Sequence, residues 1–289
     1  MTAIFKKELR TYYNSMMGYV FLTLLVVMIA VYFAFTGVFG MNTNYGQVLA
    51  SFWVIITTLL MVSVLTMRLF AEEARQRTDQ LLYTAPVTTA QIVLGKYFAA
   101  CCMLLAGTLI SGINPLMVSS YGIIPWGSVL TAHVGFFLMG CAFISVGMFI
   151  SSLTDNQIIA AAGSFVALFL MYLMDGLSSG LPASRSASVA FTVMLAFGLA
   201  ALIWFSTKNA VMAAGGAVLG VAVIIACYAI NAMWFDGLMI NMFRWFSISS
   251  RFESFSRGIF DMSNIVYYLT FSAAFVYLTI NRLEKRRWN

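Results

Sequence analysis

Residues 72–96 read E-E-A-R-Q-R-T-D-Q-L-L-Y-T-A-P-V-T-T-A-Q-I-V-L-G-K, a charged, proline-containing segment between two long apolar stretches. The stretch before it, Thr11 to Met67, and the stretch after it, Tyr97 to Thr154, contain no Asp, Glu, Lys or Arg. Each is long enough for about two membrane-spanning helices of roughly 20 residues with a turn between them. We therefore expect the charged segment to project into water from a protein that is otherwise embedded in a bilayer.

The composition agrees with an integral membrane protein. Of the 289 residues, 62% are hydrophobic and 9% are charged, whereas roughly 25% are charged in a typical soluble domain. We expect an all-α polytopic fold that forms one transmembrane domain over residues 1–289. Apolar runs of spanning length predict about eight helices. They are Gly18 to Phe39, Leu49 to Phe70, Ala90 to Tyr121, Ser128 to Ser151, Ile158 to Met174, Ser188 to Phe205, Ala210 to Trp234 and Ile265 to Ile280.

The distribution of basic residues predicts which side of the membrane each loop faces. With the N-terminus in the cytoplasm, twelve of the 16 Lys and Arg residues lie inside: Lys6, Lys7, Arg10, Arg68, Arg75, Arg77, Lys96, Lys208, Arg282, Lys285, Arg286 and Arg287. Four lie outside: Arg185, Arg244, Arg251 and Arg257. This asymmetry agrees with the positive-inside rule and requires an even number of spans, so both termini are expected in the cytoplasm. Topology thus accounts for the net charge of +6, and we expect no nucleic-acid binding.

Two segments are predicted to lie along the membrane surface and contact its lipids. In residues 1–17, Phe5, Leu9, Tyr12 and Met16 share one helical face, which indicates an interfacial helix. Residues 235–263 are too charged to span and predict short amphipathic helices at the outer surface. Their aromatic residues either anchor the segment in the membrane or form a docking surface for an extracytoplasmic partner. The candidate docking residues are Trp245, Phe246, Arg251, Phe252 and Phe255.

The order of residues within the charged segment predicts a helix and a bend over residues 71–89, followed by a second helix. Glu73 and Arg77 stand at i,i+4 in the favourable order for a short helix between Glu72 and Tyr83. Pro86 ends it. Thr88 and Gln91 have capping-box spacing, so the next membrane helix should begin just after Thr88. With few flexible residues between the two helices, a displacement of the first is expected to move the second.

Catalytic and ligand-binding patterns are weak or missing. The pair Gly95-Lys96 lacks the spacing and the following Ser or Thr of a nucleotide-binding loop. His133 and Asp175 are more easily explained as an interfacial side chain and a helix end than as a proton or metal site. The four cysteines fall inside apolar segments. We therefore expect no catalytic residue, no metal and no cofactor on this chain.

The segment 72–96 resembles the coupling-helix region of ABC-2-type transporter permeases, and more narrowly the gliding-motility and nitrous-oxide-reductase-maturation branches. The amphipathic start, the inner loop Ser151 to Gln157 and the basic C-terminal tail extend the resemblance over most of the chain. Many ABC-2 permeases have six spans, so the hairpin from Ser188 to Trp234 would be an addition to a six-span core.

The resemblance implies partners and contact residues. Members pair two permeases, or a permease and a related fusion subunit, with two cytoplasmic ATPases in the bacterial plasma membrane, and ATP and Mg are bound by the ATPases. The residues that would contact the ATPase are Glu72, Glu73, Arg77, Thr78, Leu81 and Leu82, with Asp155 and Asn156 in a second, smaller contact.

The function expected from this resemblance is a permease that couples ATP hydrolysis to export or to mechanical signalling. The signal would pass to an auxiliary protein outside the membrane. The alternative is a membrane scaffold that is not coupled to ATP.

Overall fold

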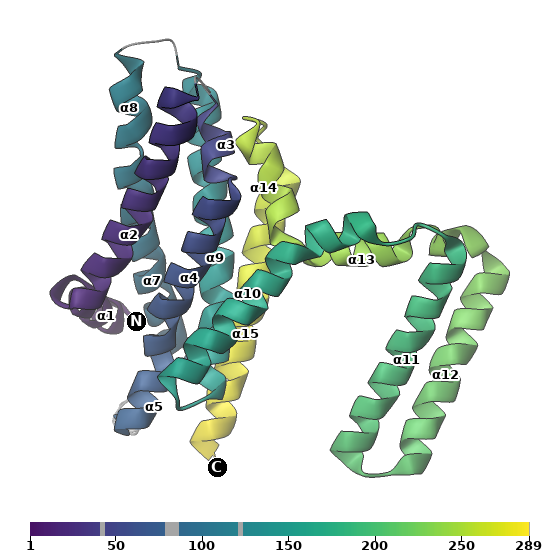
Figure 1. The fold of residues 1–289 in the computed structure, drawn as a ribbon. Helices are drawn as coiled ribbons and strands as arrows, with labels where there is room; N and C mark the ends of the chain where they lie inside the picture. The colour runs from purple at the N-terminus through teal and green to yellow at the C-terminus, as the bar shows by residue number, and fades with distance from the viewer. Residues whose placement is uncertain (41–43, 79–86, 121–123, 289) are drawn as a thin grey trace. The chain divides into compact units, whose positions relative to one another are not determined.

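The computed structural model describes residues 1–40, 44–78, 87–120 and 124–288, and within these residues the fold is helical with no strand (Figure 1). Among the described residues, eight helices are long and apolar enough to cross a membrane, as the sequence predicted. Their extents are 16–39, 52–76, 89–119, 126–153, 157–180, 185–205, 210–230 and 262–286. The chain divides into two compact units: residues 1–170 with 251–289, and residues 171–250.

The first unit contains most of the helices. They are α1 (Thr2–Asn14), α2 (Met16–Phe33), η1 (Ala34–Phe39), α3 (Tyr45–Leu49), α4 (Phe52–Met67), η2 (Arg68–Glu72), α5 (Glu73–Gln76), α7 (Thr89–Ser111), α8 (Ile113–Ser119), α9 (Trp126–Leu153), α15 (Met262–Trp288) and most of α14 (Ile248–Ser256). Helix α10 (Gln157–Gly180) begins in this unit and ends in the second. It continues past Asp175, so the prediction that Asp175 ends the fifth span is wrong.

Helix α9 forms the core of the first unit, where it packs against α4, α7 and α15. Phe136, Met139 and Phe143 of α9 are almost fully buried. Close approach is possible because α9 has glycines at its contacts: a Cβ on Gly140 would lie 2.3 Å from Leu104 of α7, and one on Gly147 would lie 2.3 Å from Thr66 of α4. Larger side chains there would force the helices apart.

The N-terminal helix is present, with a different buried face from the predicted one. Ile4, Glu8 and Tyr12, spaced by four residues, are buried on α1. The sequence placed both Tyr12 and Met16 on the apolar face of this helix. Tyr12 is buried as expected, whereas the prediction for Met16 is wrong. The chain bends at Ser15, so Met16 begins α2 and is exposed. The helical face therefore ends one turn earlier than the apolar spacing indicated.

The second unit contains a helical hairpin of α11 (Arg185–Thr207) and α12 (Ala210–Ile230), followed by η3 (Ala232–Phe235) and α13 (Leu238–Phe246). Asn209 caps α12 by accepting hydrogen bonds from the Val211 and Met212 amides. Gly220 faces Ala196 and Gly216 faces Ile203 across the hairpin, as close packing predicts, while Gly215 faces no neighbour. Arg185 binds Asp236 through two hydrogen bonds of 2.8 and 2.9 Å, which lower the pKa of that carboxyl.

Candidate functional site: a buried ion network at one end of the helix bundle

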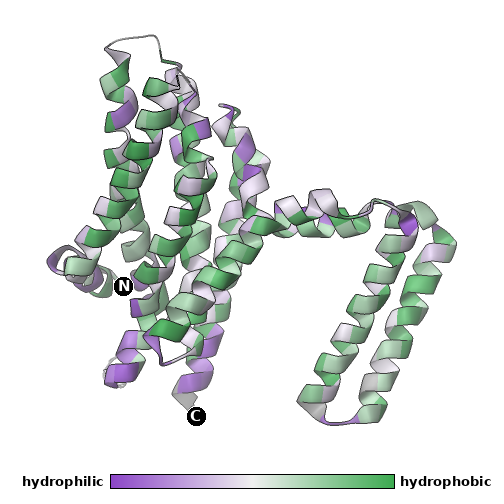
Figure 2. Ribbon diagram, in the orientation of Figure 1, coloured by the Kyte–Doolittle hydropathy of each residue, from purple (hydrophilic) through white to green (hydrophobic). Residues whose placement is uncertain are grey.

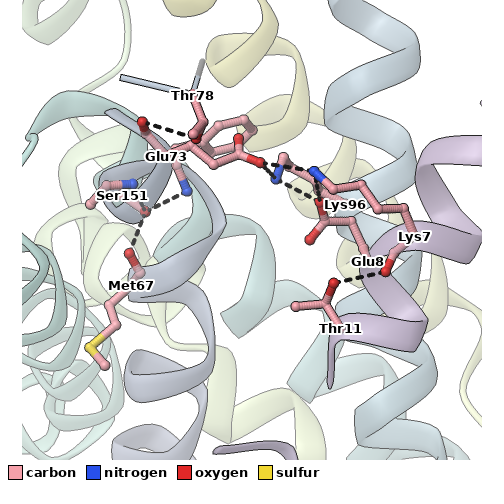
Figure 3. A network of polar contacts seen from close by, with 10 residues as sticks. Lys7, Glu8, Thr11, Met67, Glu73, Thr78, Lys96 and Ser151 are labelled. Atoms are coloured by element: carbon pink, nitrogen blue, oxygen red, sulfur yellow. Dashed lines mark hydrogen bonds and ion pairs between the residues drawn. The ribbon is translucent and has the colours of Figure 1, made fainter. Parts of the chain in front are cut away.

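Hydrophilic residues gather at one end of the first unit, on α5 and on the last turns of α15 (Figure 2). Close to this end, α1, α5 and α7 are joined by a buried ion network that consists of Glu8, Glu73 and Lys96, with Lys7 at its edge (Figure 3). We call these four residues the ion network. It includes one residue of the predicted contact set, Glu73.

Lys96 is the centre of the ion network. Its Nζ lies 3.0 Å from Glu8 Oε1 and 2.8 Å from Glu73 Oε1, and its side chain is 1% exposed. The same nitrogen lies 5.5 Å from the centre of the Phe70 ring. Two charge-assisted hydrogen bonds and a cation–π contact offset the cost of removing an ammonium group from water. Lys7 is 60% exposed and lies 3.7 Å from each glutamate, so its contribution is small.

The local sequence explains how the three helices meet. The capping box predicted for Thr88 and Gln91 is confirmed and starts α7 at Thr89. Lys96 then lies two turns inside α7. Gly95 next to it lets α1 approach, because a Cβ there would lie 3.0 Å from Ile4. Burial against this surface also raises the pKa of Tyr12, and the nearby charge of Glu8 adds to that effect.

A π-helical turn, η2, connects α4 to α5 and is held by α9. Ser151 at the end of α9 donates a hydrogen bond to the Met67 carbonyl at 3.2 Å. Its oxygen accepts hydrogen bonds from the amides of Phe70 and Ala71 at 3.3 and 3.2 Å (Figure 3). π-Turns widen the helix and leave backbone groups in need of other partners. Ser151 supplies that partner, so α9 fixes the direction in which α5 leaves the bundle.

The exposed end of α5 is bonded back to Glu73. Arg77 has a left-handed backbone conformation (φ 56°) and ends the helix. The Thr78 amide donates to the Glu73 carbonyl at 3.0 Å and the Arg77 amide donates to the Ala74 carbonyl at 3.2 Å, a Schellman arrangement. Arg75, Gln76, Arg77 and Thr78 are exposed, and we call these four residues the tip. Glu73 thus contacts the tip through its backbone and Lys96 through its side chain.

The predicted contact residues separate into distinct environments. Thr78 and Arg77 lie on the tip, whereas Glu73 faces Lys96 and Glu72 pairs with Arg68 at 2.9 Å. The expected Glu73–Arg77 pair is therefore wrong, because Glu73 is turned toward α7. The predicted helix from Glu72 ends at Gln76 rather than continuing toward Tyr83. Leu81, Leu82 and Pro86 lie outside the described residues.

The second predicted contact lies in the loop between α9 and α10. Asp155 binds Arg286 of α15 at 2.8 Å and remains 63% exposed. Asn156 accepts a hydrogen bond from the Ile158 amide and caps α10. This loop follows Ser151 by a few residues, so α9 connects it to η2.

The aromatic residues of the predicted outer surface lie in two environments. Trp245 and Phe246 of α13 are exposed. Phe252 and Phe255 of α14 are buried, packing against Phe136 and Tyr268, and Arg251 lies 4.0 Å from the centre of the Tyr267 ring. The two phenylalanines are therefore core residues in this structure and offer no surface to a partner. The sequence identified both residues as aromatic without indicating which neighbours they face.

The sequence prediction missed Glu8 and Lys96. One signal could have identified Lys96: it is the single charged residue between Val87 and Thr154. An isolated charge inside an apolar helix requires a counter-ion. The position of Glu8 between Ile4 and Tyr12 on a buried face could then have suggested one.

The fold and site define a polytopic membrane protein with a polar connection fixed at one end of its helix bundle. A family model described as ABC-2 family transporter protein matches residues 34–185. The match covers more than half of the chain and includes both η2 and the predicted contact segment, so the protein belongs to the ABC-2 transporter family. No curated protein and no solved structure matches this chain. Members of the family are typically non-catalytic membrane subunits that work with an ATPase.

Proposed function

We propose that this protein is the permease subunit of an ABC-2-type exporter, driven by a separate cytoplasmic ATPase that binds ATP and Mg. Membership of the family supports this role, and so does the lack of a nucleotide-binding loop in the sequence. On this proposal both termini lie on the cytoplasmic side of a bacterial plasma membrane. Eight crossings are consistent with that arrangement, since they return the C-terminus to the side of the N-terminus.

The observation that carries the proposal is the bonded route from the tip into the membrane helices. Thr78 is bonded to Glu73, Glu73 is bonded to Lys96 in α7, and Lys96 is bonded to Glu8 in α1. We assign docking on the ATPase to Arg77 and Thr78, and transmission of the resulting displacement to Glu73 and Lys96. Chains of packed and hydrogen-bonded groups of this kind carry coupling between two sites.

The Asp155 loop is a second contact in this scheme. Its bond to Arg286 connects it to α15, and Ser151 connects the end of α9 to η2. An ATPase that moves the tip and the Asp155 loop together would move α7, α9 and α15 as one group. Asn156 keeps the start of α10 in place through its cap.

The output is export of a substrate or a mechanical signal to an auxiliary protein outside the membrane. The second alternative is typical of the gliding-motility and nitrous-oxide-reductase-maturation branches that the sequence resembles. Trp245 and Phe246 are exposed and fit a contact with such a protein, whereas Phe252 and Phe255 do not. The functional assembly would contain a second copy of this chain or a related permease fusion.

The experiment that tests the proposal is co-purification with an ABC ATPase encoded beside this gene. We expect Arg77→Glu to abolish retention of the ATPase, because the tip is exposed and its charge is reversed. Arg257→Glu is the matched control, since Arg257 is 65% exposed and belongs to the predicted outer side. The scaffold alternative predicts that Arg77→Glu changes neither ATPase retention nor ATP turnover.

Glu73 is unsuitable for that docking test. Reversal of its charge would place two cations, Lys96 and the new side chain, together in a buried site, so a loss of the ATPase would reflect misfolding. Arg77 is exposed and outside the core, so reversing its charge tests docking of the ATPase on the tip without placing a charge in a buried site.

A further inference from the structure

A groove of about 800 Å³ lies between the last turns of α9 and α15, outside the ion network. Phe149 and Leu153 of α9 and Leu278 of α15 line its apolar part. Leu153 and Leu278 are both more than a third exposed, so this apolar part is accessible from outside the bundle. Its lining residues belong to the last turns of α9 and α15, and α15 becomes hydrophilic in these turns (Figure 2).

The other part of the groove is polar and mainly basic. Arg282 and Lys285 line it, together with Asn281, and both basic side chains are exposed. Leu278, Arg282 and Lys285 follow one another at i, i+4 and i+7, so one stripe of α15 passes from apolar to basic. Glu284 also lines the groove and is the one carboxylate among the described residues of its lining.

We propose that this groove binds an anionic phospholipid. The phosphate would lie against Arg282 and Lys285, and an acyl chain would lie along Phe149, Leu153 and Leu278. Basic pockets between membrane helices are suited to acidic lipid headgroups, and the guanidinium of arginine matches the geometry of a phosphate. The apolar lining belongs to two helices of spanning length, where acyl chains are the surrounding solvent.

Charge also favours a lipid over a second copy of this chain at the groove. In a symmetric dimer the same surface faces itself. Arg282 and Lys285 of one copy would then face those of the other, and like charges repel. An anionic headgroup neutralises them.

Lipid bound here would contact both helices that support the candidate site. Leu153 follows Ser151, which holds η2, and Arg282 and Lys285 precede Arg286, which binds Asp155. The lipid would therefore stabilise the relative position of the ends of α9 and α15.

The test is native mass spectrometry of the full-length protein in detergent, titrated with dioleoyl phosphatidylglycerol or dioleoyl phosphatidylcholine. We expect the wild type to retain phosphatidylglycerol preferentially. The double variant Arg282→Gln/Lys285→Gln should bind it roughly tenfold more weakly. Glu284→Gln should bind it more tightly, because the opposing carboxylate is removed.

The matched control is Lys6→Gln/Arg10→Gln, which removes two exposed charges from α1, away from the groove. It should leave phosphatidylglycerol binding within about twofold of the wild type if the groove is specific. Leu278→Trp fills the groove and keeps every charge, so it should also weaken binding even if the double variant is poorly folded. The proposal is overturned if Leu278→Trp binds like the wild type, or if the control loses as much binding as the groove variant.

Discussion

The ammonium group of Lys96 and the carboxylate of Glu73 lie 2.8 Å apart and join α7 directly to α5. The covalent route between these helices passes through residues 79–86, whereas this ion pair bypasses it. Glu8 accepts a second hydrogen bond from the same nitrogen, so α1 is part of the connection. Three helices are thereby fixed to one another at a single buried atom.

Replacing Lys96 should destabilise the first unit. Lys96→Met leaves Glu8 and Glu73 close together with only the mostly exposed Lys7 beside them. The expected loss is about 3 kcal/mol in the free energy of unfolding. Lys7→Met removes a mostly exposed charge, so it should cost less than about 1 kcal/mol. Unfolding in detergent, followed by circular dichroism, measures both variants. Equal stability of the two variants would mean that Lys96 does not hold the network.

Neutralising Glu8 and Glu73 should restore the stability that Lys96→Met loses. In the triple variant Glu8→Gln/Glu73→Gln/Lys96→Met no buried charge remains at the site, and the 60% exposed Lys7 is solvated by water. Replacement of a whole buried ion group is often nearly neutral. We expect the triple variant to recover most of the stability lost by Lys96→Met. The same unfolding assay gives the coupling energy. Strictly additive effects of the single substitutions would argue against a network.

Ser151 should contribute more to the free energy of unfolding than the adjacent Ser152. Ser151→Ala removes the bonds to Met67, Phe70 and Ala71 and should cost about 1–3 kcal/mol. Ser152 is equally buried, but its hydroxyl donates only to the Phe149 carbonyl in its own helix, so Ser152→Ala should cost less than about 1 kcal/mol. Hydrogen exchange of the amides in 68–72 separates a local loss of η2 from global unfolding. Unchanged exchange in Ser151→Ala would contradict the role assigned to this residue.

The orientation of the tip can be measured by thiol labelling. Thr78→Cys should react with a membrane-impermeant maleimide only after the cells are opened, and Arg257→Cys should react in intact cells. The wild type is the blank, because its four cysteines lie in spanning helices. Labelling of Thr78→Cys from outside intact cells would reverse the proposed orientation.

Local signals were readable from the sequence, whereas contacts between distant residues were not. The eight spans follow from apolar length, and the capping box at Thr88 depends on residues three apart. Glu8 and Lys96 are 88 positions apart, and no periodicity relates them. The same reason explains the error at Glu73: spacing favoured Arg77, but the tertiary fold supplied a stronger partner in Lys96. Phe252 and Phe255 were misplaced because the aromatic content of a segment does not indicate which of its side chains pack into the core.

The central claim is that Glu73 transmits the displacement of the tip to α7, and ATP turnover by the co-purified assembly tests it most directly. Glu73→Gln keeps the size of the side chain, and Lys96 keeps Glu8 as a counter-ion, so the protein should fold and retain the ATPase. We predict that the stimulation of ATP turnover by the permease falls about fivefold or more in Glu73→Gln, with Lys7→Gln unchanged. Wild-type stimulation in a folded Glu73→Gln assembly would contradict the account.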